Sequence, residues 1–332
     1  MELSRRDFIK NLLKLGSGVA VAGALGSLAA CAKESEPTLT PSPPPPATTP
    51  APTQQPTAVP APPDKAYLAV ARGQSPGLIV QAAIKALGGM ERFVRKGNDV
   101  IIKPNICVAY NTYEYAATTN PEVVAALVKL CLAAGAGRVR VMDQPFGGTA
   151  QQAYERSGIG KAVKEAGGEM EIMSGMKFRE VDIPDGRDIK KWSVYADALD
   201  TDVLINVPIA KHHNLGRLTL GMKNLMGLIK DRGQFHFNLG QRVADLTSLL
   251  RPQLTVVDAV RILTNHGPTG GDLADVKLMN TIIASHDIVA ADTYAATLFG
   301  LTADDIPIIR AAAPMGMGTT DLKSMKVEEI NV

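Results

Sequence analysis

The residues best suited to chemistry lie between Lys211 and His236. This segment contains three histidines, and its lysines and arginines outnumber its single acid, Asp231. Local positive charge of this kind favours an anionic partner. Glycines here would let backbone amides approach a carboxylate or phosphate, while Lys211 and Lys223 supply charge and Asn224 orients the ligand. The alternative is a solvent-exposed basic loop, and the sequence leaves the two interpretations even.

Polar residues also end four apolar segments that have the composition of buried strands. In open α/β sheets the ligand crevice lies outside the carboxyl ends of the strands. If the four strands are parallel neighbours, their terminal side chains face one cleft. The residues concerned are Lys103, Asn105, Asp143, Asn206, Lys211 and Asp258. We expect Lys103 to hold the anion together with Lys211 and Lys223, and Asn105 to orient it together with Asn224.

Histidine supplies the candidates for proton transfer. We expect His213 and His236 to move protons, with Asp143 and Asp258 positioning them. The same two histidines are the candidates for a metal ligand. No familiar metal-ligand spacing occurs in the chain. The sequence therefore permits a metal without indicating one, and it leaves the cofactor unknown.

A second glycine-rich loop covers residues 266–272. Gly267 and Gly271 could expose backbone amides in a nest that holds an anion. The same glycines would equally suit a tight connection that needs positive φ. Both interpretations stay open at this point.

Apolar spacing predicts the elements that carry these side chains. Strands are expected over 66–71, 99–103, 138–143, 169–173, 203–207, 254–258, 281–284 and 325–330, and helices over 77–87, 121–134, 149–166, 242–250 and 288–299. Asn120 and Asp287 are placed to cap two helices. The polar stretch 179–198 is expected to form a small antiparallel element. The fold class is therefore α/β, a largely parallel sheet with helices on both faces, built as one domain or as two closely joined lobes.

The N-terminal segment has the pattern of a targeting signal. Arg5 and Arg6 precede a glycine-rich apolar run over 12–30, as in a twin-arginine export signal. The run ends in Leu-Ala-Ala before Cys31, which is typical of a lipoprotein cleavage site with Cys31 as the lipid acceptor. An uncleaved transmembrane anchor fits less well, because the run is only weakly apolar. We therefore expect a signal peptide over 1–30, export by the twin-arginine machinery, and anchoring to a bacterial membrane outside the cytoplasm.

Composition limits the remaining possibilities. Residues 31–63 are expected to form a lipidated cysteine and a disordered tether, because the stretch is rich in proline and uncharged from 37 to 63. Residues 64–332 suffice for an α/β domain. Removing residues 1–30 leaves equal numbers of acidic and basic side chains, so no nucleic-acid partner is expected. Besides Cys31 the chain has only Cys107 and Cys131, which argues against an iron–sulfur cluster.

Several short motifs follow one another in a fixed order along the folded part. They are Lys103-Pro-Asn105, Thr119-Asn-Pro121, Asp143-x-Pro145, Asn206-Val-Pro208-x-x-Lys211-x-His213, Lys223-Asn224-x-x-Gly227, His236, Asp258-Ala259, Gly267-Pro268-x-x-Gly271 and Ala284-Ser285-x-Asp287-x-Val-Ala290-x-Asp292. In this order the chain resembles, from about residue 66 to 318, the bacterial and archaeal family called domain of unknown function 362.

The resemblance implies little about activity, because that family has no settled one. Some of its members carry an added ferredoxin-like module, whose cysteines this chain lacks, so an iron–sulfur label is not carried over. The family is also distantly similar to the lactate-racemase type of fold, in which lysines and histidines hold a nickel-bearing organic cofactor. That likeness concerns the fold alone.

Three functions are compatible with these observations. The first is a membrane-anchored enzyme or cofactor protein that acts on an anionic small molecule in a cleft lined by Lys, His and Asn. The second is a lipoprotein that binds a solute without catalysis. The third is a component of an envelope assembly. Turnover, binding without turnover, or neither would separate the three.

Overall fold

A ten-stranded sheet runs through residues 65–332, which are the residues that the computed structural model describes. Its strands are β1 (Leu68–Arg72), β2 (Asp99–Pro104), β3 (Arg138–Val141), β4 (Glu169–Met170), β7 (Val203–Val207), β8 (Ile209–His213), β9 (Arg217–Thr219), β10 (Leu254–Leu263), β11 (Val276–Ser285) and β12 (Val327–Asn331). The expected signal peptide, Cys31 and the tether lie outside the described residues.

The central strands of the sheet are parallel. The order is β12-β1-β11-β10-β7-β2-β3-β4, with β8 beside β10 and β9 beside β8. Strands β10, β7, β2, β3 and β4 pair in parallel, whereas β11 is antiparallel to both of its neighbours. The prediction of a largely parallel sheet is confirmed. Contacts group the folded residues into one unit rather than two lobes.

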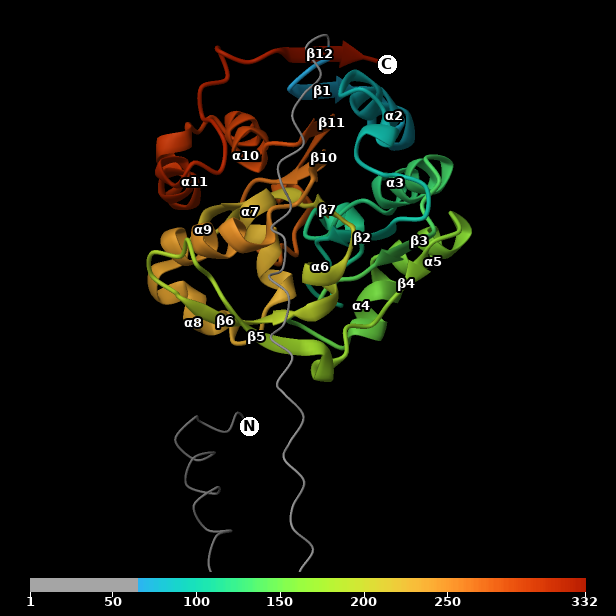
Figure 1. Cartoon of the computed structure of the whole chain (residues 1–332). Coiled ribbons are helices and arrows are strands. Elements are labelled where there is room, and N and C mark those ends of the chain that lie inside the picture. The colour runs from blue at the N-terminus through green and yellow to red at the C-terminus, as the bar shows by residue number, and fades with distance from the viewer. Residues whose placement is uncertain (1–64) are drawn as a thin grey trace, which may run out of the picture. The chain divides into compact units, whose positions relative to one another are not determined.

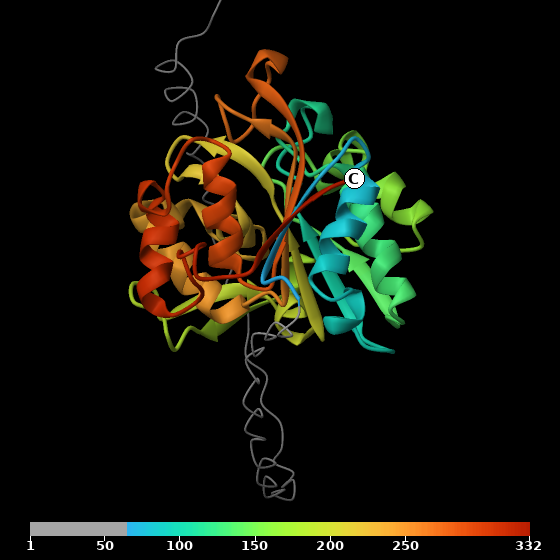
Figure 2. The ribbon, with the colours of Figure 1, turned by 90° about the horizontal axis from the view of Figure 1, so that it is seen from above.

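Helices cover both faces of the sheet, as Figures 1 and 2 show. One face carries α2 (Pro76–Ala86), α3 (Pro121–Ala133), α4 (Ala150–Arg156) and α5 (Ile159–Glu165), and the other carries α7 (Gly221–Asn224), α9 (Leu239–Leu250), α10 (Ile288–Thr297) and α11 (Pro307–Ala312). Each layer has its own apolar core, with Ile79 and Leu127 fully buried in the first and Val243 and Ile309 in the second. Burial on both faces explains why β2 and β7 are almost continuously apolar.

The predicted helix caps are confirmed, and one predicted helix is divided. The Asn120 side chain accepts a hydrogen bond from the Glu122 amide, and the Asp287 side chain accepts one from Ala290. The helix expected over 149–166 is interrupted between α4 and α5. Gly158 adopts a φ of +77° there, which ends one helix and begins the next.

The polar stretch forms the expected antiparallel pair, β5 (Phe178–Asp182) and β6 (Lys191–Tyr195), followed by α6 (Ala196–Asp200). The β8–β9 hairpin and α11 were not expected, and α8 (Arg232–Phe235) is a single short turn. Strands β10 and β11 are much longer than their apolar cores suggest. Within residues 65–332, no helix has the length and apolarity needed to cross a membrane.

Candidate functional site

A cavity of about 560 Å³ opens beyond the carboxyl ends of β2 and β3, beside the β8–β9 hairpin and α7. This is the edge at which parallel α/β sheets bind ligands, and the volume suits a small molecule. The cavity collects most of the residues that the sequence singled out. Those lining it are Lys103, Asn105, Asp143, Lys211, His213, Lys223, Asn224 and His236.

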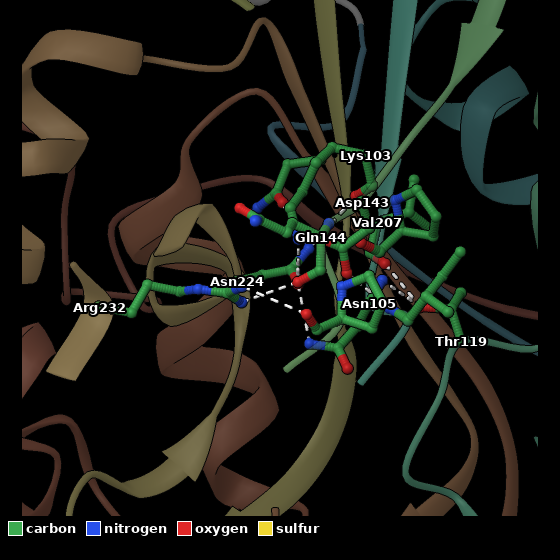
Figure 3. A network of polar contacts seen from close by, with 12 residues as sticks. Lys103, Asn105, Thr119, Asp143, Gln144, Val207, Asn224 and Arg232 are labelled. Carbon is green, nitrogen blue, oxygen red and sulfur yellow. Dashed lines mark hydrogen bonds and ion pairs between the residues drawn. The ribbon is translucent and has the colours of Figure 1, made fainter. Parts of the chain in front are cut away.

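Lys103 and Asp143 form a buried ion pair on one wall of the cavity (Figure 3). The Lys103 Nζ lies 2.8 Å from Asp143 Oδ1 and also donates to the Pro104 carbonyl and to Asn224 Oδ1. Asp143 in turn accepts from the Ile106 amide at 2.6 Å. Burial lowers the pKa of Lys103, and the Asp143 carboxylate opposes that shift. Every proton of this ammonium has an acceptor, so Lys103 holds the wall together and has none left for a ligand.

A glycine makes room for that ion pair. Gly227 lies against it, and a Cβ at this position would overlap Asp143 Oδ1 and the Lys103 Nζ. The motif Lys223-Asn224-x-x-Gly227 is therefore a packing requirement as well as a source of polar groups.

Three asparagines link the cavity wall to the sheet. Asn224 Oδ1 accepts from Lys103 and from Asn105 Nδ2, and Asn224 Nδ2 donates to Asn206 Oδ1 at 2.9 Å. Asn206 lies behind this layer and donates to the Gly221 carbonyl, so it supports the site without lining the cavity. Both the oxygen and the nitrogen of the Asn224 side-chain amide are therefore hydrogen-bonded, which fixes α7 against β2 and β7.

Lys211 is as fully bonded as Lys103. Its Nζ donates to Asn105 Oδ1 at 3.0 Å, to the Ala117 carbonyl at 2.6 Å and to the Pro268 carbonyl at 2.9 Å. These are neutral acceptors, so the positive charge of Lys211 remains uncompensated while its protons are all in use. Lys211 contributes to the potential of the cavity rather than to direct contact.

Lys223 differs from both. It is half-buried and lines the cavity, and no hydrogen bond or ion pair joins its Nζ to any of residues 65–332. The pKa of Lys223 is lowered from 10.5 to about 7, mainly by burial and also by the nearby charges of Lys211, Arg232 and Lys103. The cavity thus presents one ammonium whose donors are free.

The ring nitrogens of His213 show what this residue can do. Its Nδ1 accepts hydrogen bonds from the amides of Leu215 and Gly216, at 3.2 and 3.1 Å. A neutral ring in this arrangement carries its proton on Nε2, so His213 can donate to a ligand but cannot accept a proton there. Burial, reinforced by Lys223, lowers the pKa of His213 to about 3. The ring is stacked on that of His236 with centroids 6.3 Å apart.

This geometry does not suit a metal held by the two histidines. The lone pair on His213 Nδ1 already accepts two backbone hydrogen bonds, so it cannot bind a metal. A neutral ring that bound a metal through Nε2 would carry its proton on Nδ1, where it would point at the two amide N–H groups. No group of three or more His, Cys, Asp or Glu within residues 65–332 is placed to hold a metal ion. His236 remains available for proton transfer, with its pKa lowered by burial and by Lys223.

Besides Asn206, three predicted site residues lie away from the cavity lining. Asp258 is internal to β10, because that strand continues to Leu263, and its buried carboxylate accepts from the amides of Asn120 and Val260. Burial raises the pKa of Asp258 to about 6. Gly267 and Gly271 do not line the cavity either. The Gly267 amide donates to His212 Nδ1, and a Cβ at Gly267 would overlap the His212 carbonyl.

The lining also includes residues that were absent from the sequence-based set, among them Arg232, Gln144, Cys107 and Phe146. Arg232 donates to the carbonyls of Gln144 and Pro145, which leaves its other N–H groups free to face a ligand. The Gln144 side-chain oxygen is buried and has no partner within the described residues. Cys107 lies on the wall, and Phe146 lines the cavity with 58% of its surface exposed. All of these except Arg232 follow the ends of β2 or β3, and that position is the signal that could have found them.

The site and the sheet define an α/β protein with a cation-rich cavity at the carboxyl edge of parallel strands. The family model for domain of unknown function 362 (DUF362) matches residues 100–297, a range that includes every residue lining the cavity. The chain belongs to this family.

Comparison with known proteins finds a relative in a cyanobacterium and remote similarity to solved structures, including the two that follow. A thylakoid-associated protein of Synechocystis sp. is 28% identical over 256 residues, which are 73% of this chain and 75% of that protein. The lactate racemase apoprotein of Thermoanaerobacterium thermosaccharolyticum aligns with a TM-score of 0.42 and 11% identity, over 68% of this chain and 56% of the racemase. A Thermotoga maritima protein aligns with a TM-score of 0.37 and 11% identity, over 69% of this chain and 60% of that one.

Proposed function

We propose that this protein is an extracytoplasmic lipoprotein whose folded domain binds, and acts on, a small anionic molecule in the cavity beside α7. The observation that carries this proposal is the free ammonium of Lys223. A cation without an acceptor in a half-buried position is costly, and a bound anion would relieve that cost.

The charge balance of the wall favours the same ligand. Lys103, Lys211, Lys223 and Arg232 line the cavity, and Asp143 is the acid among the lining residues. Asp143 is committed to Lys103 at 2.8 Å. The remaining cations create a positive potential in a partly enclosed space, where charge interactions are stronger than in water.

Donors that remain free would make the contacts. We assign direct binding to Lys223, to the unused N–H groups of Arg232 and to Nε2 of His213. Lys103 and Lys211, which the sequence suggested as anion ligands, instead stabilise the cavity wall through their hydrogen bonds and add to its positive electrostatic potential. A ligand that also carries a hydroxyl would satisfy the Gln144 oxygen.

The experiment is a thermal-shift screen of the full chain against phosphate, sulfate and a panel of small carboxylates. Binding to the native state raises Tm by mass action. We expect at least one anion to raise the Tm of the wild-type chain and of Lys161→Met, a control whose side chain is 81% exposed. Lys223→Met should lose the shift. If Lys223→Met responds like the wild-type chain, the assignment of the cavity is wrong.

Anchoring is tested separately. Replacing Cys31 by Ser should move the protein from the membrane fraction to a soluble one, and replacing Arg5 and Arg6 by Lys should retain it in the cytoplasm. Unchanged fractionation of both variants would contradict the lipoprotein proposal and leave the cavity proposal untouched.

A further inference from the structure

We propose that Lys223 is a nucleophile that forms a Schiff base with a small 2-oxo acid. This inference rests on the proposed function, because binding of the carboxylate is what would bring the carbonyl to the amine. It adds a reaction class and a substrate class to the anion site.

The choice of Lys223 follows from its neighbours. The other two lysines of the cavity, Lys103 and Lys211, have all their protons engaged by oxygen acceptors. Turning either amine towards a substrate would break several buried hydrogen bonds. Lys223 needs no such rearrangement, since its Nζ has no partner within residues 65–332.

The backbone that carries Lys223 is held on both sides. At the start of α7, the amides of Gly221 and Met222 donate to the two carboxylate oxygens of Asp292, at 2.6 and 3.0 Å. On the other side, Asn224 is bonded to Lys103, Asn105 and Asn206. Because the backbone of this turn is fixed, a nucleophile on it loses little backbone conformational entropy when it reaches a bound carbonyl.

The electrostatic environment supplies the reactive form of the amine. Only a neutral amine attacks a carbonyl, and burial beside other cations is a recognised means of producing one near neutral pH. With a pKa of about 7, a substantial fraction of Lys223 is neutral at pH 7. The Arg232 guanidinium, which also lines the cavity, can hold the carboxylate of the substrate.

The step balances without a further reagent. The Nζ lone pair forms a bond to the carbonyl carbon as the C=O π electrons move to oxygen, and the two amine protons leave with that oxygen as water. The product is a neutral imine. The Nε2 proton of His213, which lines the same cavity, is available to hydrogen-bond the oxygen as it gains charge.

Reductive trapping tests the inference. The full chain is incubated with glyoxylate, pyruvate or 2-oxoglutarate, reduced with borohydride and mapped by peptide mass spectrometry. At least one probe should modify Lys223, at least tenfold more than the exposed Lys161. Lys223→Arg, which keeps the positive charge, should show no adduct at that position. Trapping should also fall roughly tenfold per pH unit below pH 7, as the amine becomes protonated.

Lactate, an anion of similar size without the reactive carbonyl, separates the two proposals. If lactate or phosphate shifts the Tm through Lys223 but none of the three probes gives an adduct, the Schiff base is wrong and the anion site stands. Equal labelling of Lys223 and Lys161 would also overturn the inference. If no anion binds, both proposals fail.

Discussion

Replacing Lys223 by Met should stabilise the folded protein, which is the opposite of what removing a half-buried side chain normally does. The reason is that the folded chain disfavours the charged amine, whose pKa drops from 10.5 to about 7. This difference corresponds to roughly 4 to 5 kcal/mol at a pH where the amine is charged in both states. Water at the cavity mouth screens part of that cost, so we expect Lys223→Met to gain about 3 kcal/mol.

The pH dependence fixes the sign of the effect. Because the folded-state pKa of Lys223 lies below the unfolded one, the folded state loses its proton first as pH rises. The wild-type chain therefore recovers stability between about pH 7 and pH 10.5. The advantage of Lys223→Met should be complete at pH 6 and should shrink by up to about 1.4 kcal/mol per pH unit above pH 7.

Urea unfolding at pH 6 and pH 9 measures this directly. Trp192 is the only tryptophan of the chain, and its ring packs edge-on against Phe235, so its fluorescence reports loss of tertiary structure. Lys161→Met is the control and should leave the free energy of unfolding unchanged. The reasoning is refuted if Lys223→Met is no more stable than the wild-type chain at pH 6, or if its advantage is the same at pH 9.

Three further substitutions test the framework of the site in the same urea titration. Asn224→Leu should cost about 3 kcal/mol, because it leaves buried amide and ammonium partners unpaired; a neutral result would contradict the network. Gly227→Ala should lower the free energy of unfolding by about 2 kcal/mol, because the added Cβ overlaps Asp143. An unchanged urea midpoint would show that the side chains of the cavity wall can move to make room for it. The wild-type chain should lose stability as the pH rises from about 4 to 7, and Asp292→Asn should remove part of that loss. Burial raises the pKa of Asp292 to about 7, so the folded state opposes its ionisation over that range; a variant with the wild-type pH profile would exclude this cause.

The framework of the fold is accessible from the sequence because it depends on local patterns. The apolar runs that became β2 and β7 are buried on both faces, and the caps at Asn120 and Asp287 act within four residues of themselves. The position of the site at the strand ends follows from the topology of parallel sheets. Elements without a strong apolar period, such as the β8–β9 hairpin, were not accessible in this way.

The roles of the individual side chains depend on partners that are distant in sequence. Lys103 meets Asn224 and Lys211 meets Asn105, so which lysine is free cannot be read from spacing. The His213 tautomer depends on amides that the hairpin brings to its ring. Asp258 was expected at the end of a strand, but β10 extends five residues beyond it and pairs there with β11 and β8, so Asp258 lies inside the strand.

Locating a bound anion by X-ray diffraction tests the central claim most directly. Crystals of the full chain and of Lys223→Met, grown with selenate, would show the selenium by its anomalous signal. We predict a peak in the cavity within hydrogen-bonding distance of the Lys223 Nζ and the Arg232 guanidinium in the wild-type protein, and none there in the variant. A cavity without selenate in both crystals, or an equal peak in the variant, would contradict the assignment of this site to an anionic ligand.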